Sequence, residues 1–302
     1  MQQVLPCRAR FGATARHTPI IRERVDLPDR RNPLVTEQIR SSPLDAYDEQ
    51  ERAVNIGRHE PADTRSMGIV HSALRRDLER IRMTLQTEPY PKGKRRLALA
   101  DHVVWLMYAL RLHHSAEDAG LWPLIRAKNP SAGALLVRME ADHRRIAPAM
   151  IALEGAGRAY GRDASTRTRV LDTLAELNEV LLPHLQREEL EMMPVVAATI
   201  TASEYRDVEN EYFVKPKGVV ELGAEAPWIV DGATTEDRDV ILHVVPAVPR
   251  FVIMQTFGRI YRRKVARLWE DGPAAAVPPI KVTAPRGEAR TIREFDSRHL
   301  AP

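Results

Sequence analysis

Four segments between residues 63 and 194 carry apolar side chains at the three- and four-residue spacing of an amphipathic helix. The expected helices cover about residues 63–85, 94–121, 131–155 and 163–194. Pro123 and Pro194 are expected to stop the second and fourth helices, and the glycines of 155–161 to end the third. Because the connections are short, consecutive helices should be antiparallel neighbours. The pattern therefore predicts an all-α fold built on an up-down-up-down four-helix bundle.

The rest of the chain divides into a helical extension and two irregular ends. Thr201 to Glu204 form a capping box that should open a short helix reaching about Phe213. Further helices are expected near 219–226, 235–243 and 249–269. The ends combine prolines and charges without sustained periodicity, which is typical of disorder. The expected organisation is a disordered arm 1–62, a bundle 63–194, a C-terminal helical extension 195–272 and a disordered tail 273–302.

Polar residues interrupt the apolar stripe of every predicted bundle helix. Imidazole and carboxylate groups four residues apart leave the same face of a helix, and this spacing occurs on the second and fourth helices. The first and third helices each place one histidine in their stripe. The candidate ligands are His71, His113, Glu117, His143, His184 and Glu188.

The depth of these residues along their helices tests whether they can meet. The histidines lie early, late, early and late in the four helices, so antiparallel packing puts them near one level. Burying such groups without partners is costly, and a bound metal would compensate for it. Imidazole with a minority of carboxylate suits iron, and also zinc, copper or nickel. Two carboxylates on different helices could bridge a metal pair.

At these residues the chain resembles the hemerythrin-like HHE cation-binding domains. The similar pieces are His71, the run His113-His114-Ser-Ala-Glu117-Asp118 with its following Leu-Trp-Pro, His143 in Ala-Asp-His-Arg-Arg-Ile, and His184-Leu-Gln-Arg-Glu188-Glu189. The resemblance covers about 64–194 and implies two non-haem iron ions, joined by an oxo or hydroxo bridge, that meet dioxygen, peroxide or nitric oxide. It also implies that the four histidines are terminal ligands and that Glu117 and Glu188 bridge.

The chain departs from the oxygen-carrying hemerythrins at two positions. The carriers have a second histidine four residues before the one on helix 3, where this chain has Met139. One iron would then lack a ligand unless Glu140 or His114 supplies it. The carriers also use a carboxylate five residues after the last histidine, which here is Glu189. On a regular helix Glu188 points about 40° from His184 and Glu189 about 140°, so we favour Glu188.

Several conspicuous residues are expected to have ordinary roles. His114, turned about 100° from His113, is expected on the flank of the stripe or behind a ligand, with ligation as the alternative. His102 should be a hydrogen-bonded packing histidine, and Glu191 a surface residue at the mouth of the bundle.

The function hypotheses depend on Met139. A thioether is a poor ligand for hard iron, so a vacancy there would let an oxidant reach both metals. The hypothesis is therefore a peroxide-decomposing di-iron protein, a possible oxidoreductase, with a non-catalytic oxygen-binding, iron-binding or redox-sensing module as the alternative. A ferritin-like oxidase would need two Glu-x-x-His motifs, and the stripe offers one, Glu140 with His143. A structural zinc bundle is the third reading.

Composition bears on location and partners. The single cysteine, Cys7, fits a reducing cytoplasm, and no apolar run of 18 residues suggests a membrane span. The net charge is +4, and the predicted helix 249–269 is strongly basic. Residues 195–247 hold ten acids against four bases, so this helix is expected to pack on its own chain rather than on a membrane or nucleic acid. The expected partner is a small oxidant, and the oligomeric state is not predicted.

Overall fold

The computed structural model describes residues 60–243, 247–269 and 272–282. The predictions of a disordered arm over 1–59 and of a disordered tail over 283–302 lie outside these residues. Among the described residues every regular element is a helix, apart from one isolated bridge between Pro61 and Thr201. The predicted all-α fold is confirmed.

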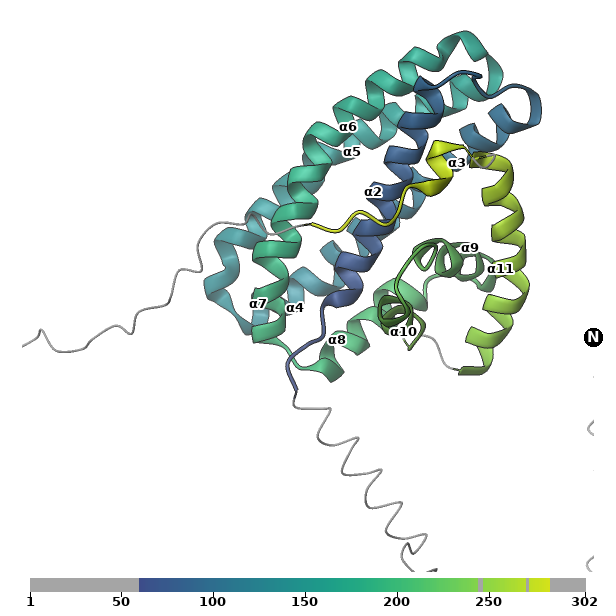
Figure 1. Cartoon of the computed structure of the whole chain (residues 1–302). Helices are drawn as coiled ribbons and strands as arrows, with labels where there is room; N and C mark the ends of the chain where they lie inside the picture. The colour runs from purple at the N-terminus through teal and green to yellow at the C-terminus, as the bar shows by residue number, and fades with distance from the viewer. Residues whose placement is uncertain (1–59, 244–246, 270–271, 283–302) are drawn as a thin grey trace, which may run out of the picture. The chain divides into compact units, whose positions relative to one another are not determined.

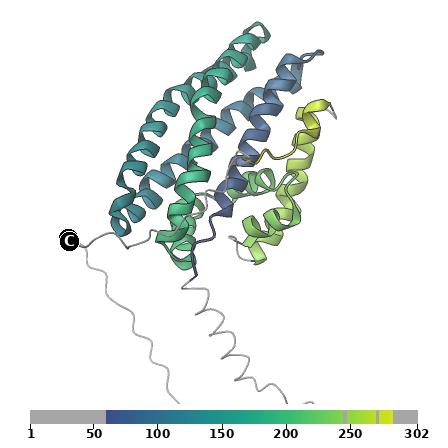
Figure 2. The same ribbon diagram turned by 60° about the vertical axis from the view of Figure 1, so that its left-hand side comes forward.

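Four long helices form an antiparallel bundle, which Figures 1 and 2 show from two sides. They are α2 (Arg65–Gln86), α3 (Gly93–Ala116), α5 (Gly133–Arg162) and α6 (Arg167–Arg187). Single 3-10 turns, η2 (Pro130–Ala132) and η3 (Ala164–Thr166), precede α5 and α6. The predicted bundle helices are therefore present, and their apolar stripes face one another in the core.

Two of these helices continue through the prolines that were expected to stop them. After α3 the chain makes a π-helical turn, η1 (Glu117–Leu121), and resumes as α4 (Trp122–Lys128). After α6 it makes the turn η4 (Glu188–Met192) and resumes as α7 (Met193–Thr199). Pro123 and Pro194 are the second residues of the resumed helices, where the missing N–H costs little. The expected stops were wrong for this reason.

The glycines of 155–161 do not end α5, which runs to Arg162. They let two helices approach closely instead. A Cβ added at Gly157 would lie 2.9 Å from Cγ1 of Val103 on α3, and one at Gly161 would lie 3.3 Å from Cβ of Ala100. Packing between α3 and α5 outweighs the low helix propensity of glycine here.

The extension consists of short helices and one long one. They are α8 (Ala202–Val208), the π-helical turn η5 (Glu209–Val214), α9 (Val219–Ile229), α10 (Thr235–His243), α11 (Ala247–Trp269) and the 3-10 turn η6 (Pro273–Ala276). The capping box at Thr201 and Glu204 forms as predicted. The expected end of the helix at Pro227 is not observed, because α9 continues through this proline to Ile229.

A buried polar network attaches the extension to α2 and α3. The Asp77 carboxylate accepts hydrogen bonds from Nε1 of Trp228 at 3.0 Å and pairs with Nε2 of His102 at 2.7 Å. The Arg76 guanidinium donates to the carbonyl oxygens of Trp228 and Asp231. His102 is thus the hydrogen-bonded packing histidine that the sequence predicts. Charged groups so deeply buried are stabilised by being paired.

The basic helix α11 packs on its own chain along one face. Ile253, Leu268 and Trp269 are buried, and the Lys264 ammonium lies 5.1 Å from the ring centre of Trp105. Among the described residues, no helix is both long enough and apolar enough to cross a membrane.

Two short segments assigned to the disordered ends pack against the bundle. The Ile280 N–H donates to the Ser72 carbonyl on α2, and Arg80 donates to the Val277 carbonyl, so residues 273–282 lie along that helix. At the other end, the Ala62 N–H donates to the Ile200 carbonyl. Backbone pairing, which leaves no periodicity in the sequence, therefore attaches residues on both sides of the expected boundaries 63 and 272 to the bundle.

Candidate metal centre

The predicted ligands lie at one level of the bundle, between two apolar clusters. The larger cluster fills the length of the bundle on one side of this level, and includes Leu74, Leu110 and Ile146. The smaller one lies on the other side and includes Met67 and Leu121. Since both clusters exclude water, the polar groups between them are screened from solvent. The structure brings all six sequence-predicted residues together at this level.

The first group of side chains comes from α2 and α3. Nε2 of His71 lies 3.1 Å from Nε2 of His113, and Nε2 of His113 lies 2.9 Å from Oε1 of Glu117. These three residues offer donor atoms that all lie within 4.8 Å of one another. They therefore have the spacing of ligands to one metal ion.

The second group consists of three histidines from α3, α5 and α6. The rings of His114 and His143 are stacked with centres 4.2 Å apart, and the His184 ring lies edge-on at 4.8 Å from His143. Their donor nitrogens again lie within 4.8 Å of one another. A second metal ion would fit here.

Two buried carboxylates connect the groups. Oε1 of Glu117 lies 2.9 Å from His113 in the first group, while Oε2 lies 3.4 Å from Nε2 of His143 in the second. Oε2 of Glu188 lies 3.5 Å from Nε2 of His71 and 3.6 Å from Nε2 of His184. Both side chains are fully buried. Each carboxylate thus spans the two groups, as a bridging ligand must.

The carboxylate behind each of three histidines comes from a neighbouring helix. Nδ1 of His143 lies 2.9 Å from Asp118, and Nδ1 of His71 lies 2.9 Å from Glu189. Nδ1 of His184 lies 3.7 Å from Asp142, which also pairs with Arg187. The two shorter contacts fix the ring orientation and the tautomer of His143 and His71, and leave their Nε2 atoms to point inward.

Many buried polar atoms of the site have no hydrogen-bond partner among the described residues. They are both ring nitrogens of His114 and His184, Nε2 of His143, and both carboxylate oxygens of Glu117 and Glu188. Leaving buried donors and acceptors unsatisfied costs about 1–3 kcal/mol each, and more for charged groups. Metal cations would supply partners for the carboxylate oxygens and for one nitrogen of each ring, so the donor set fits metal ions.

The pKa shifts of the buried site residues are also consistent with a site for cations. Burial, together with the nearby Glu117 carboxylate, raises the pKa of Glu188 well above its usual range. For Glu117, burial opposes ionisation, but the surrounding imidazoles outweigh it and lower the pKa. Burial and the neighbouring His143 lower the pKa of His184 to about 3, so its imidazole is neutral and able to bind a metal.

His114 is the residue that sequence reasoning placed differently. It was expected on the flank or behind a ligand, yet it is buried inside the second group. Adjacent residues on a helix point about 100° apart, so His113 and His114 can each face one of two metals that lie side by side. The signal in the sequence was the His-His pair immediately before Glu117 on a core-facing turn.

The other residues considered for the site lie apart from it. Met139 is buried in the smaller apolar cluster. Glu140 pairs with Arg126 at 2.6 Å, and Glu191 is half exposed with Arg138 at 3.4 Å, the surface position expected for it. Glu189 stands behind His71 rather than between the groups. Of the two residues proposed to compensate for Met139, only His114 reaches the cluster.

Comparison with known proteins agrees with this geometry. No curated protein and no solved structure shows significant similarity to the chain. The family model of the hemerythrin HHE cation-binding domain matches residues 64–197, the region from the start of α2 into α7. Every candidate ligand lies within the matched residues. The four-helix bundle of this chain is therefore a hemerythrin HHE cation-binding domain.

Proposed function

We propose that this domain holds two non-haem iron ions and uses them to bind a small oxidant: dioxygen, nitric oxide or hydrogen peroxide. The observation that carries the proposal is the span of Glu117 and Glu188 across two separate histidine groups. One metal ion would leave one of these groups without a cation. Two ions joined by two carboxylates use all the inward-facing donors.

Iron fits this donor set better than zinc does. Structural zinc usually takes four ligands in a tetrahedron, often with cysteine among them. Here five imidazoles and two carboxylates converge, and no cysteine is among the described residues. Imidazole and carboxylate together suit iron with positions left for an external ligand. When bound, the iron pair would supply coordination and redox chemistry for the oxidant.

The protein offers unequal donor sets to the two ions. The second group provides three imidazoles, from His114, His143 and His184, while the first provides two, from His71 and His113. The shared carboxylates add the same number of ligands to each. The external ligand is therefore expected on the side of His71 and His113.

This asymmetry changes the balance between the two function hypotheses. Peroxide decomposition rested on Met139, because a missing imidazole would add an open position to the single one that a carrier has, so that each ion would have one. His114 occupies the second group and compensates for Met139. A single vacancy favours the binding module, in which a small oxidant binds at one ion and is carried or sensed.

We also propose a cytoplasmic location for the protein, because the single cysteine of the chain, Cys7, fits a reducing compartment.

The test is the metal content and reactivity of the full chain purified from iron-supplied cells. We expect about two irons per chain and an optical spectrum that changes reversibly over repeated cycles of dioxygen or nitric oxide. One zinc per chain, or no transition metal, would overturn the di-iron proposal. Steady release of dioxygen from added peroxide would instead establish the catalase-like activity that the sequence favours.

A further inference from the structure

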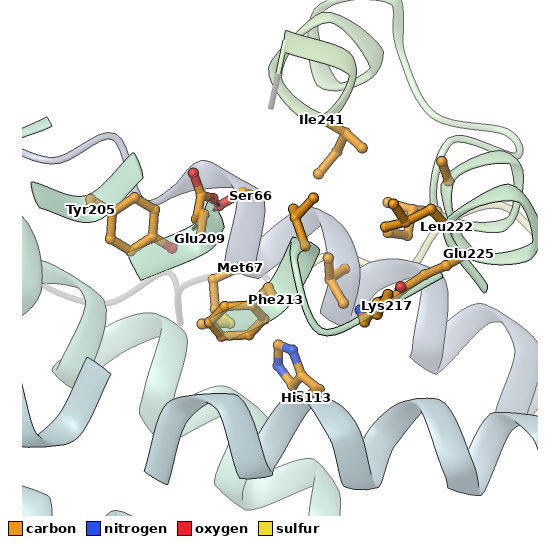
Figure 3. Close-up of a pocket in the computed structure, with 14 residues that line it drawn as sticks. Ser66, Met67, His113, Tyr205, Glu209, Phe213, Lys217, Leu222, Glu225 and Ile241 are labelled. Carbon is orange, nitrogen blue, oxygen red and sulfur yellow. Dashed lines mark hydrogen bonds and ion pairs between the residues drawn. The ribbon is translucent and has the colours of Figure 1, made fainter. Parts of the chain in front are cut away.

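The extension encloses a cavity of about 110 Å³ above the first histidine group. Figure 3 shows that His113 projects into this cavity from α3 below, while Ser66 and Met67 of α2 and side chains of the extension surround it on the other sides. The side chain of His113 is 10% exposed, whereas those of His71, Glu117, His184 and Glu188 are completely buried. Among these candidate ligands, His113 is the one that can be reached from the cavity.

Most of the cavity wall is apolar. Met67 and Val70 of α2 line it from the bundle, and Leu222 and Ile241 line it from α9 and α10. The Phe213 ring lies at 5.7 Å from the His113 ring, tilted by 64°. Water gains few hydrogen bonds from such a surface, so an apolar molecule can displace it at low cost.

One corner of the wall is polar. The Ser66 hydroxyl donates to Oε1 of Glu209 at 2.7 Å and lies 3.2 Å from the Tyr205 hydroxyl. These three residues also line a larger, polar hollow of about 690 Å³ next to Arg65 and Glu236. The corner therefore stands between that hollow and the apolar cavity, where it can form a hydrogen bond with a molecule in either.

The charges of the cavity exclude an ionic ligand. Lys217 is the cation of the wall, and it is paired with Glu225 at 2.5 Å. Glu209 carries the remaining carboxyl group, and burial raises the pKa of that group to about 7. An anion would meet Glu209 without a free cation to balance it, and a cation would lose its hydration against apolar walls.

We propose that this cavity binds one small, uncharged, mostly apolar molecule carrying a single hydrogen-bonding group, with the apolar part against Phe213 and Leu222 and the polar group at Glu209. The volume limits the ligand to no more than about one aromatic ring, because a closed cavity of roughly 150 Å³ holds benzene. This cavity is smaller, about 110 Å³, but it is open on one side. The role of this molecule beside the metal pair, as a substrate or an effector of the oxidant site, rests on the proposed function. The binding of the molecule in the cavity does not rest on it.

The turn η5 is the feature that creates the site. It begins at Glu209 and includes Phe213, and these two side chains form the polar corner and the cover over His113. Single π-helical turns occur often at functional sites, because the extra residue redirects side chains that a regular helix would place elsewhere. The extension thus gives the HHE domain a ligand site that the bundle does not contain.

The test is calorimetric titration of the full chain with three probes: phenol, toluene and benzoate. We expect phenol to bind best, toluene several-fold more weakly, and benzoate not measurably. The substitution Ala226→Phe fills the cavity from α9 and should weaken phenol at least tenfold, whereas Ala266→Phe, at an exposed position of α11, should leave it unchanged. If Ala226→Phe does not fold, Leu222→Trp fills the same space.

The polar corner is tested separately with Glu209→Leu, which should abolish the preference for phenol over toluene. The proposal is overturned if benzoate binds as well as phenol, or if a folded filled variant binds phenol like the wild type. Because calorimetry reads the cavity and elemental analysis reads the iron, failure of this proposal is distinguishable from failure of the proposed function.

Discussion

The two histidine groups are built with the same sequence device but have different surroundings. His113 with Glu117 and His184 with Glu188 both place an imidazole one turn before a carboxylate, at the start of a π-helical turn. His184 is fully buried, and Asp142 stands behind it. His113 instead meets Phe213 of the extension and borders a cavity.

This comparison separates two tasks. The bundle supplies the ligands and holds them in register, which requires only four apolar stripes with polar residues at one level. In the proposed di-iron site, the extension would decide which metal can be reached, because it covers the bundle on the side of α2 and α3. An HHE bundle with a different extension would be expected to keep the metal pair and lose the selectivity for what approaches it.

The largest effect is expected from removing a carboxylate that both groups share. Glu117→Ala deletes a ligand of both ions and leaves Glu188 as the one carboxylate that the two groups share. We expect nearly complete loss of iron, measured per chain by elemental analysis, together with a lower thermal midpoint, since metal binding adds to folding stability. Glu191→Ala, at a half-exposed carboxylate, is the control and should keep both irons. Two irons retained in the Glu117 variant would contradict the bridging role.

The second prediction concerns a substitution that changes one histidine group and leaves the other intact. His114→Ala should lower iron to about one per chain, because only the second group loses an imidazole. His102→Ala is a matched control, since it removes another buried histidine from α3. It leaves Asp77 short of a partner and should destabilise the fold by about 1–3 kcal/mol while keeping both irons. Equal iron contents in the two variants would show that His114 is a packing residue.

The third prediction concerns Met139 and asks again which residues supply ligands to the site. Because this side chain is buried among apolar neighbours, Met139→His should reduce stability without increasing the iron content. An increase in bound iron, or slower decay of peroxide, would restore the hypothesis that the sequence favours through this residue.

The sequence predicts the bundle well because periodicity reports which face of a helix is buried. The stripes of α2, α3, α5 and α6, and the early-late alternation of their histidines, are visible without coordinates. Where the helices end was harder to predict, since Pro123 and Pro194 occupy first-turn positions after π-helical turns. Such a turn depends on tertiary contacts and leaves no clear pattern in the residues.

The candidate site shows the same limit. Six inward-facing residues follow from the stripes, while His114 does not, because regular geometry puts it 100° from His113. Helix geometry alone cannot reveal that His143 and His184 lie close to it. The cavity depends on Phe213 and Ile241 meeting α2 and α3 from far along the chain. Contacts between distant segments carry no local signature, so the sequence could not predict them.

The fourth prediction concerns pH and tests the polar corner of the cavity. The pKa of Glu209 is about 7 in the folded protein, because burial outweighs the hydrogen bond from Ser66, and Asp63 and Arg206 oppose each other nearby. A carboxyl group with a raised pKa stabilises the fold below its unfolded value, near 4.5, and that contribution is lost as pH rises through about 7.

Glu209→Gln should remove this loss. We expect the unfolding free energy of the variant, relative to the wild type, to increase by on the order of 3 kcal/mol between pH 4.5 and 8. The measurement is chemical denaturation at several pH values, with Glu140→Gln as the control at a carboxylate paired on the surface. Parallel curves for the Glu209 variant and the wild type would mean that Glu209 is ionised as easily as a surface residue.

The smallest effect is expected from the carboxylates behind the histidines, and it tests the two groups against each other. Asp118 orients His143 in the second group, and Glu189 orients His71 in the first. Removing such a partner typically costs 10–100-fold in metal affinity, and Asp118, which is 46% exposed, should lie near the lower limit, about 1.4 kcal/mol. Glu189 is better buried and also pairs with Arg75, so Glu189→Gln should weaken iron more than Asp118→Asn does. In a two-step iron titration each variant should shift one step and leave the other unchanged. A shift of both steps by the same factor would show that the metals bind as a single unit. The difference between the first histidine group, which borders the cavity, and the second, which is enclosed, would then apply to the metal-free protein alone.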